Sequence, residues 1–112
     1  MIKILTDEIL IQINQMVLNS KSGNYYKDKL GLVFSSYYYY ESDEEQIASV
    51  VRSLIKNHVF IDGNKRTAYL VFMTLAHENE IPINRSKDFG KLFENIAASN
   101  YSVEKIAELL FK

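Results

Sequence analysis

The stretch HVFIDGNKR, residues 58–66, combines side chains that could act together on a phosphate group. Imidazole titrates near neutral pH, which makes His58 a candidate general base for an attacking hydroxyl. Asp62 supplies a carboxylate of the kind that holds a magnesium ion against phosphate oxygens. Lys65 and Arg66 supply positive charge for the phosphate itself. These are the components that phosphoryl or nucleotidyl transfer requires.

The two cations stand where a helix normally avoids positive charge. Gly63 and Asn64 end a loop, with Asn64 as the expected N-cap, so Lys65 and Arg66 would occupy the first helical turn. Each cation opposes the helix dipole there by about 0.3–1 kcal/mol at an exposed site. A bound anion would reverse that sign, because the unpaired backbone N–H groups, the dipole and both cations would converge on it. Gly63 would let such a ligand approach the backbone closely.

The rest of the sequence predicts helices that would position this motif. Apolar residues recur at helical spacing in several segments, each preceded by a residue that can cap a helix. The segment 65–79 is apolar on almost every side, as is typical of a central, buried helix. The sequence therefore predicts one all-α domain, residues 1–112, forming a compact bundle around that helix. The other expected helices follow N-caps at Thr6, Ser42, Ser86 and Ser102. The first two run over 7–19 and 43–57, and the apolar positions of the last two span 89–97 and 103–110.

Two segments lack this helical pattern. Residues 21–31, KSGNYYKDKLG, contain turn-forming residues and predict a loop. The tract VFSSYYYYE, residues 33–41, is rich in residues that favour strands and predicts an extended or hairpin-like segment. Four consecutive tyrosines, Tyr37–Tyr40, cannot all be buried on one face, so some are expected to be exposed or to wait for a partner.

Composition excludes several classes of function. The chain has no cysteine, which rules out a disulfide framework, a thiolate zinc site and a thiol nucleophile, and which fits a reducing cytoplasm. No apolar run approaches the ~20 residues of a membrane span, and the N-terminus lacks the apolar run of a signal peptide. The formal net charge of −1 argues against direct nucleic-acid binding and requires any anion site to be local.

The motif resembles the core signature of the Fic/Doc family, H-x-F-x-(D/E)-(A/G)-N-(G/K)-R, at every specified position. The order of segments along the whole chain is also similar to that of the Doc branch. Lys65 replaces the glycine of typical Fic enzymes, and Tyr69 stands where those enzymes have a second arginine. Both departures are Doc-like.

The resemblance implies a Doc-like toxin that uses ATP and Mg²⁺ to phosphorylate a hydroxyl of a target protein. By the same resemblance the target is translation elongation factor Tu, growth arrest follows, and a Phd-like antitoxin silences the toxin in the cytoplasm. The implied fold is the Fic/Doc helical bundle with a short extended flap at Tyr37–Tyr40 that docks the target. The implied roles are general base for His58, magnesium ligand for Asp62, anion cradle for Asn64 and the amides after Gly63, and phosphate binding for Lys65 and Arg66.

Other interpretations remain open from the sequence. The same fold could transfer AMP or another nucleotide, although a cation at position 65 disfavours this. The chain could instead be a non-catalytic module that binds a partner protein, in which case His58 would be an ordinary residue at a helix end. The tyrosine tract could be a structural strand or a loop rather than a docking segment.

Overall fold

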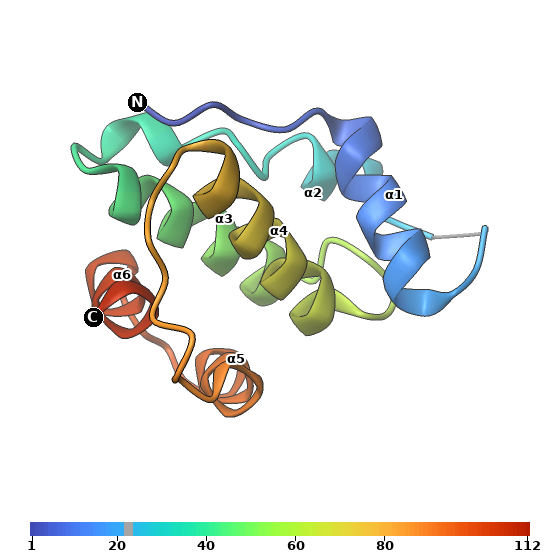
Figure 1. Cartoon of the computed structure of the whole chain (residues 1–112). Coiled ribbons are helices and arrows are strands. Elements are labelled where there is room, and N and C mark those ends of the chain that lie inside the picture. Colours follow the sequence, from blue (N-terminus) through green and yellow to red (C-terminus); the bar gives the residue numbers. More distant parts are fainter. Residues whose placement is uncertain (22–23) are drawn as a thin grey trace.

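Six α-helices and one turn of 3₁₀ helix make up most of the described chain, which comprises residues 1–21 and 24–112 of a computed structural model (Figure 1). Within these ranges β-pairing is limited to an isolated antiparallel bridge between Tyr25 and Phe60, so the predicted all-α class is confirmed. In chain order the elements are α1 (Asp7–Leu18), α2 (Lys27–Leu30), the 3₁₀ turn η1 (Tyr37–Tyr39), α3 (Asp43–Lys56), α4 (Asn64–Glu78), α5 (Phe89–Ala98) and α6 (Val103–Phe111).

Three of the predicted N-caps are confirmed. The side-chain oxygens of Thr6, Ser42 and Ser102 each accept a hydrogen bond from a backbone N–H in the first turn of α1, α3 and α6. Each bond satisfies a donor that the helix cannot satisfy itself. These caps fix where the helices begin, and so which residues the following apolar positions bury.

The predicted cap of α5 is wrong. Asp88, not Ser86, accepts the hydrogen bond from Lys91 N–H, and α5 begins at Phe89. Ser86 instead donates its hydroxyl hydrogen to Asn84 Oδ1 at 2.6 Å. Both serine and aspartate can cap a helix. Here the Ser86 hydroxyl is bonded to Asn84 in the local turn, and Asp88 forms the cap.

Helix α4 is the centre of the bundle, as predicted. It packs against α3, α1 and α5, and every residue from Thr67 to Ala76 is buried or half-buried. Phe72 is fully buried and meets the rings of Phe89, Phe93 and Phe111 at centroid separations of 5.4–6.0 Å. This aromatic contact holds α5 and α6 against the central helix. The packing of α4 against its neighbours therefore fixes the position of its N-terminal turn.

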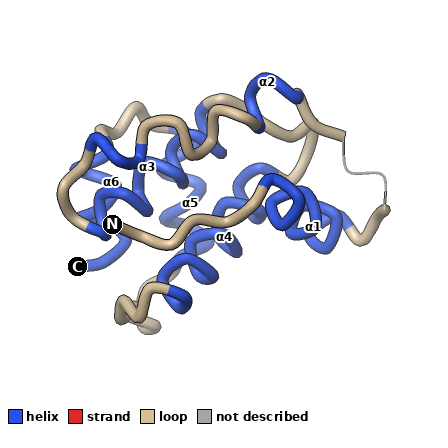
Figure 2. The backbone as a smooth tube through the Cα atoms, turned by 90° about the horizontal axis from the view of Figure 1, so that it is seen from above, coloured by secondary structure: helices blue, strands red, loops and turns tan. Residues whose placement is uncertain are grey.

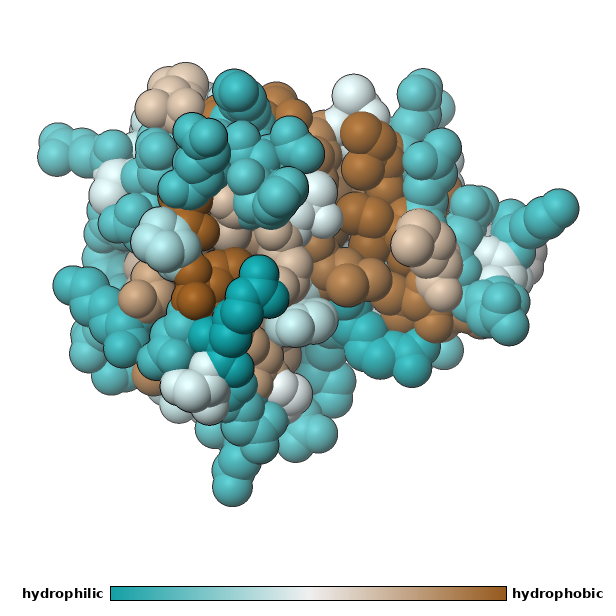
Figure 3. Space-filling view, in the orientation of Figure 1, coloured by the Kyte–Doolittle hydropathy of each residue, from teal (hydrophilic) through white to brown (hydrophobic). Residues whose placement is uncertain are grey.

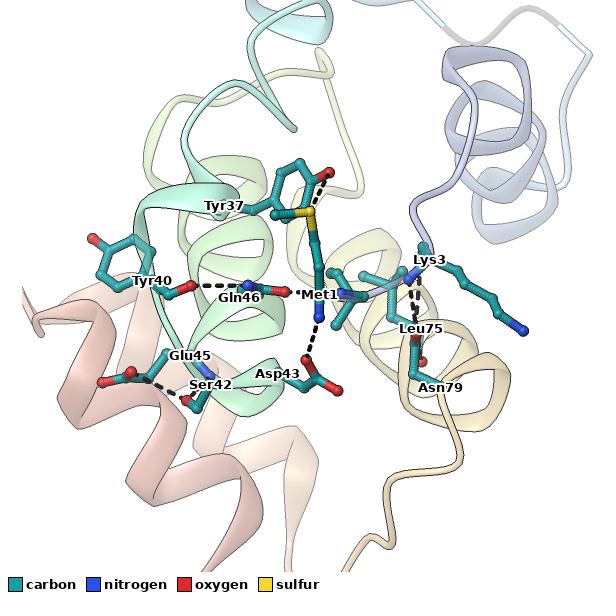
Figure 4. A network of polar contacts seen from close by, with 11 residues as sticks. Met1, Lys3, Tyr37, Tyr40, Ser42, Asp43, Glu45, Gln46, Leu75 and Asn79 are labelled. Carbon is teal, nitrogen blue, oxygen red and sulfur yellow. Dashed lines mark hydrogen bonds and ion pairs between the residues drawn. The ribbon is translucent and has the colours of Figure 1, made fainter.

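The tyrosine tract is not extended. Residues Tyr37–Tyr39 form a 3₁₀ turn, so the predicted strand-like conformation is wrong. Figure 4 shows the contacts that hold the tract: the Gln46 side chain donates to Tyr40 C=O at 2.8 Å, and the Tyr37 hydroxyl lies 3.8 Å from the sulfur of Met1. These tertiary contacts favour a tight turn over the extended form that the residue types prefer. Tyr38 also donates to Tyr39, and this hydrogen bond raises the pKa of Tyr38 above its usual value.

The predicted loop over 21–31 also needs a correction. Residues Lys27–Leu30 form the short helix α2, with Leu30 buried and its N–H bonded to Tyr26 C=O at 2.9 Å. Burial of this one leucine anchors a turn that the local sequence pattern does not reveal. Residues 22–23 of the same predicted loop lie outside the described residues.

The segment before α1 crosses the bundle alongside α4 (Figure 2). Its backbone is held at both sides: Ile2 N–H donates to Gln46 on α3, and Lys3 N–H donates to Asn79 after α4, at 2.8 and 2.7 Å (Figure 4). None of the described helices is both long enough and apolar enough to cross a membrane.

Hydrophobic residues reach the surface on the side where α1 lies (Figure 3). Ile9 and Met16, both in α1, are 38% and 72% exposed. Apolar atoms contribute more than half of the surface of ordinary soluble proteins, so this exposure does not by itself indicate a binding site.

Candidate active site

The loop that carries the motif, residues 57–63, connects α3 to α4 and lies beside the C-terminal end of α1 (Figure 1). Asn64 ties this loop to the start of α4. Its side-chain oxygen accepts from Phe60 N–H at 2.9 Å, and its side-chain nitrogen donates to Phe60 C=O at 2.7 Å. Phe60 itself is buried in the core. The loop is therefore fixed at one end by a buried ring and at the other by a two-bond amide clamp.

This clamp means that the predicted N-cap of α4 is wrong. The cap residue is Gly63, in the left-handed region with φ 77° and ψ 19°, and no side chain caps the helix. The first helical bond runs from Thr67 N–H to Gly63 C=O, so the three preceding N–H groups have no intrahelical partner. Because the Asn64 side chain bonds to the loop backbone, an anion cradle here would consist of those backbone N–H groups.

Helix α1 sets the shape of this turn. A Cβ atom on Gly63 would lie 3.1 Å from Leu18 Cδ2 and 3.2 Å from Val17 Cγ1, which is tighter than ordinary contact. The positive φ adds a second reason for glycine at this position. The requirement for Gly63 is thus set by the neighbouring helix as well as by the turn.

Asn14 of α1 is a residue of this site that the sequence analysis missed. Its side chain is fully buried and donates to Asp62 C=O at 2.9 Å and to Thr67 Oγ1 at 3.0 Å. It thereby connects α1 to both sides of the glycine turn. The sequence could have indicated Asn14, because it is a polar residue beside Ile13 on the apolar face of its helix.

We expect Asn14→Ala to destabilise the protein by about 1–2 kcal/mol. Losing two buried hydrogen bonds costs about 1–3 kcal/mol for each group left unpaired. Asn14 Oδ1, however, is buried without a partner among the described residues, so removing it recovers part of that cost. Denaturant unfolding measures the change, with Gln12→Ala on the exposed side of α1 as the matched control. Equal unfolding midpoints for the two variants would show that the hydrogen bonds of Asn14 contribute nothing to the stability of the protein.

The predicted polar residues line one cleft of about 690 Å³. Its boundary includes the C-terminal end of α3, the motif loop and the first turn of α4. Lys56 also lines it, a cation that the sequence analysis did not single out, and its ammonium donates to Ala97 C=O at 3.0 Å. The residues of the motif in the lining are His58, Ile61, Asp62, Gly63, Asn64, Lys65 and Arg66.

His58 follows α3 in a left-handed conformation, with φ 48°. It lies one residue beyond the C-cap Asn57, at the position where helices commonly end with a left-handed glycine. A side chain in this conformation costs about 1–2 kcal/mol. The chain therefore keeps an exposed imidazole at the mouth of the cleft although glycine would be easier to accommodate.

The charged groups of the cleft have few internal partners. Asp62 Oδ1 accepts from Gly63 N–H at 2.7 Å, and Arg66 donates one guanidinium hydrogen bond to Val17 C=O. No ion pair joins Lys65 or Arg66 to a carboxylate anywhere in residues 1–21 and 24–112. Both cations stay exposed, so an ordinary surface ion pair does not account for them.

Within the described ranges, no three histidine or carboxylate side chains gather into a metal site. Among the residues that the structure describes, Asp62 alone offers an exposed carboxylate to the cleft. One carboxylate is consistent with magnesium, because that ion commonly binds through one or two carboxylates, water and the phosphates of a substrate. The donor set therefore fits a metal that arrives with a nucleotide.

The tyrosine tract and the motif lie at opposite ends of α3 (Figure 1). A 14-residue helix is about 20 Å long. The structure therefore does not bring Tyr37–Tyr40 to the cleft, and the docking role of the tract stays a prediction.

A different segment lies against the motif loop. Tyr26 N–H donates to Val59 C=O at 2.9 Å, and Ile61 N–H donates to Asn24 C=O at 3.0 Å, around the antiparallel bridge between Tyr25 and Phe60. Tyr25, Tyr26 and Ile61 are exposed. This pairing joins residues far apart in sequence, and no local pattern indicated it.

Comparison with known proteins relates the chain to a family whose model covers the motif. The family model described as "Fic/DOC family" matches residues 4–76, which include the whole motif and most of α4. The chain is also 30% identical over 66 residues to Toxin Doc of Mycolicibacterium smegmatis, a match that covers 56% of this chain and 51% of that protein. The chain thus spans about half the length of the curated relative it matches.

Proposed function

The chain belongs to the Fic/Doc family, and we propose that it is a Doc-like toxin that transfers the γ-phosphoryl group of ATP to a protein hydroxyl. One observation supports this most strongly. A candidate base, a carboxylate and an uncapped helix start line the same cleft as two cations that have no carboxylate partner in residues 1–21 and 24–112. Elongation factor Tu is the proposed target. A Phd-like antitoxin and a cytoplasmic location complete the proposal, with no role in binding nucleic acid or membranes.

The proposed reaction follows from the positions of these groups. The target hydroxyl oxygen bonds to the γ-phosphorus while the bond from that phosphorus to the bridging oxygen breaks, which releases ADP. His58 takes the hydroxyl proton. Lys65, Arg66 and the backbone N–H groups at the start of α4 stabilise the charge on the transferred group. Magnesium held by Asp62 would neutralise charge on the phosphate oxygens.

AMP transfer by the same cleft is the alternative, and the Lys65 side chain is the reason it ranks second. A glycine at that position would leave open space over the first turn of α4, whereas lysine places a cation there. A non-catalytic binding module is the third candidate. A binding module would need neither His58 nor two cations that lack carboxylate partners among the described residues. The presence of these residues in one cleft therefore disfavours it.

Labelling separates these functions. The chain is incubated with Mg²⁺ and either γ-labelled or α-labelled ATP, in a bacterial lysate and with purified elongation factor Tu. We expect label on protein from the γ position only, and a mass increase of about 80 Da on the target, which corresponds to one phosphoryl group. Label from the α position with about 329 Da added would establish AMP transfer. No label from either position would favour the binding module.

A further inference from the structure

Asn14 of α1 holds the glycine turn of the motif on both of its sides. Its amide nitrogen donates to Asp62 C=O at 2.9 Å, just before Gly63, and to Thr67 Oγ1 at 3.0 Å. Thr67 N–H in turn donates to Gly63 C=O at 2.9 Å and closes the first turn of α4. The N–H groups of residues 64–66, which have no intrahelical partner, lie between these fixed points along the chain. One amide therefore sets the backbone of the whole turn.

We infer that Asn14 is a positioning residue for the phosphoryl transfer, an inference that rests on the proposed function. Its side chain is fully buried, so it contacts neither nucleotide nor target and acts through the turn. The Asp62 backbone is held by Asn14, and the Asp62 carboxylate is held by Gly63 N–H at 2.7 Å. Releasing the turn from α1 would therefore let the carboxylate and the free N–H groups move relative to each other. A displacement of about 1 Å can lower the rate at a site by ~10²-fold.

Packing does not explain an asparagine at this position. Asn14 Oδ1 is buried and has no partner among the described residues, which costs free energy. Leucine has nearly the same shape and would fill the space without burying an unpaired oxygen. The amide group is therefore disfavoured for burial alone. What it provides is a donor shared by two acceptors of the turn, Asp62 C=O and Thr67 Oγ1.

Asn14→Leu keeps the volume of the side chain and removes both hydrogen bonds. The Thr67 hydroxyl can then bond to Gly63 C=O, and the exposed Asp62 can bond to water through its C=O, so we expect the variant to fold. Calorimetric titration of the whole chain with Mg²⁺ and inorganic triphosphate measures the phosphate site without any turnover. We expect Asn14→Leu to bind triphosphate about tenfold more weakly. Phosphorylation of purified elongation factor Tu should fall by at least the same factor.

Gln46 on α3 provides a matched control. It is also a buried amide with two hydrogen bonds, since it accepts from Ile2 N–H and donates to Tyr40 C=O, both at 2.8 Å (Figure 4). Gln46 is absent from the cleft lining. Gln46→Met keeps a side chain of similar length, and it should lower the unfolding midpoint while leaving the affinity for triphosphate unchanged.

Thr67→Val breaks one of the two bonds and leaves Asn14 in place. Valine has the shape of threonine without the hydroxyl, so the buried position stays filled. We expect triphosphate binding to be about threefold weaker, a smaller loss than for Asn14→Leu, because the bond to Asp62 remains. This variant gives a measurement that does not depend on the folding of Asn14→Leu.

Three results would overturn the inference. If Asn14→Leu and Thr67→Val bind triphosphate and phosphorylate the target as the unaltered chain does, the turn needs no support from α1, and the proposed function stands. If Gln46→Met loses as much triphosphate affinity as Asn14→Leu, Asn14 only supports the fold. If the unaltered chain neither binds triphosphate nor phosphorylates protein, the inference and the proposed function both fail.

Discussion

Replacing His58 with alanine lowers target phosphorylation by ~10²–10⁴-fold, the usual contribution of a general base. The imidazole is the candidate proton acceptor in the cleft, and the only other carboxylate or imidazole of the motif, Asp62, is assigned to magnesium. Growth arrest by the overexpressed chain should disappear with the activity. Phosphorylation of purified elongation factor Tu and colony counts after induction measure the two effects.

Two further variants separate catalysis from folding. Because His58 has a φ of 48°, His58→Gly should relieve backbone strain. We expect this variant to be at least as stable as the unaltered chain and as inactive as His58→Ala. His77→Ala removes the other histidine, which is exposed near the opposite end of α4, and should keep full activity. If His58→Ala still arrests growth as the unaltered chain does, toxicity does not depend on this chemistry.

The sequence predicted the helices well wherever one short stretch of residues determines the outcome. Thr6, Ser42 and Ser102 cap helices through a bond to a residue three positions later, so the sequence alone contains the whole interaction. The all-round apolar character of 65–79 likewise revealed the central helix. The motif was also local, with its polar residues within nine positions of one another, and these residues do line one cleft.

The predictions failed where particular side-chain and backbone contacts override the preference of the residue types. Asn64 is a good cap by type, but its side chain clamps Phe60 and leaves the cap position to Gly63. The tyrosine tract prefers an extended form by composition, but Gln46 and the first residue of the chain hold it in a turn. The pairing of residues 24–26 with 59–61 depends on how the chain folds back. The Asn64–Phe60 and Gln46–Tyr40 bonds span only four and six positions, but residue type alone does not show that they form. The Tyr37–Met1 contact joins residues far apart in sequence, as does the 24–26 pairing.

The arrangement of charge at the cleft has an energetic consequence. Lys65 and Arg66 oppose the dipole of α4 and gain no ion pair within the described residues, so the unliganded site carries repulsion. A phosphate removes that repulsion and also satisfies the free N–H groups. Nucleotide binding is therefore expected to raise the melting temperature of the chain, since a ligand that binds only the folded state stabilises it.

Replacing Arg66 with alanine should lower turnover by ~10²–10³-fold, the usual loss when a group that stabilises the transition state is removed. Arg66 is assigned to the charge of the transferred phosphoryl group, whereas Tyr69 is not expected to contact phosphate. Arg66→Ala should therefore reduce turnover at saturating ATP more than Tyr69→Ala does. Equal losses of turnover in these two variants would contradict the assignment of Arg66 to phosphate.

Arg66 also has a structural contact, so its effect on stability must be measured separately. Its bond to Val17 C=O contributes about 1 kcal/mol, an amount that cannot explain a hundredfold loss of activity in a folded protein. Arg52 is a matched control, because it donates to Tyr101 C=O at 2.9 Å and to Asn100 Oδ1 at 3.1 Å and is absent from the cleft lining. Arg52→Ala should lower the melting temperature at least as much as Arg66→Ala while keeping full turnover. If Arg52→Ala instead loses turnover in the same proportion, the defect of Arg66→Ala lies in folding, and the guanidinium has no place in phosphoryl transfer.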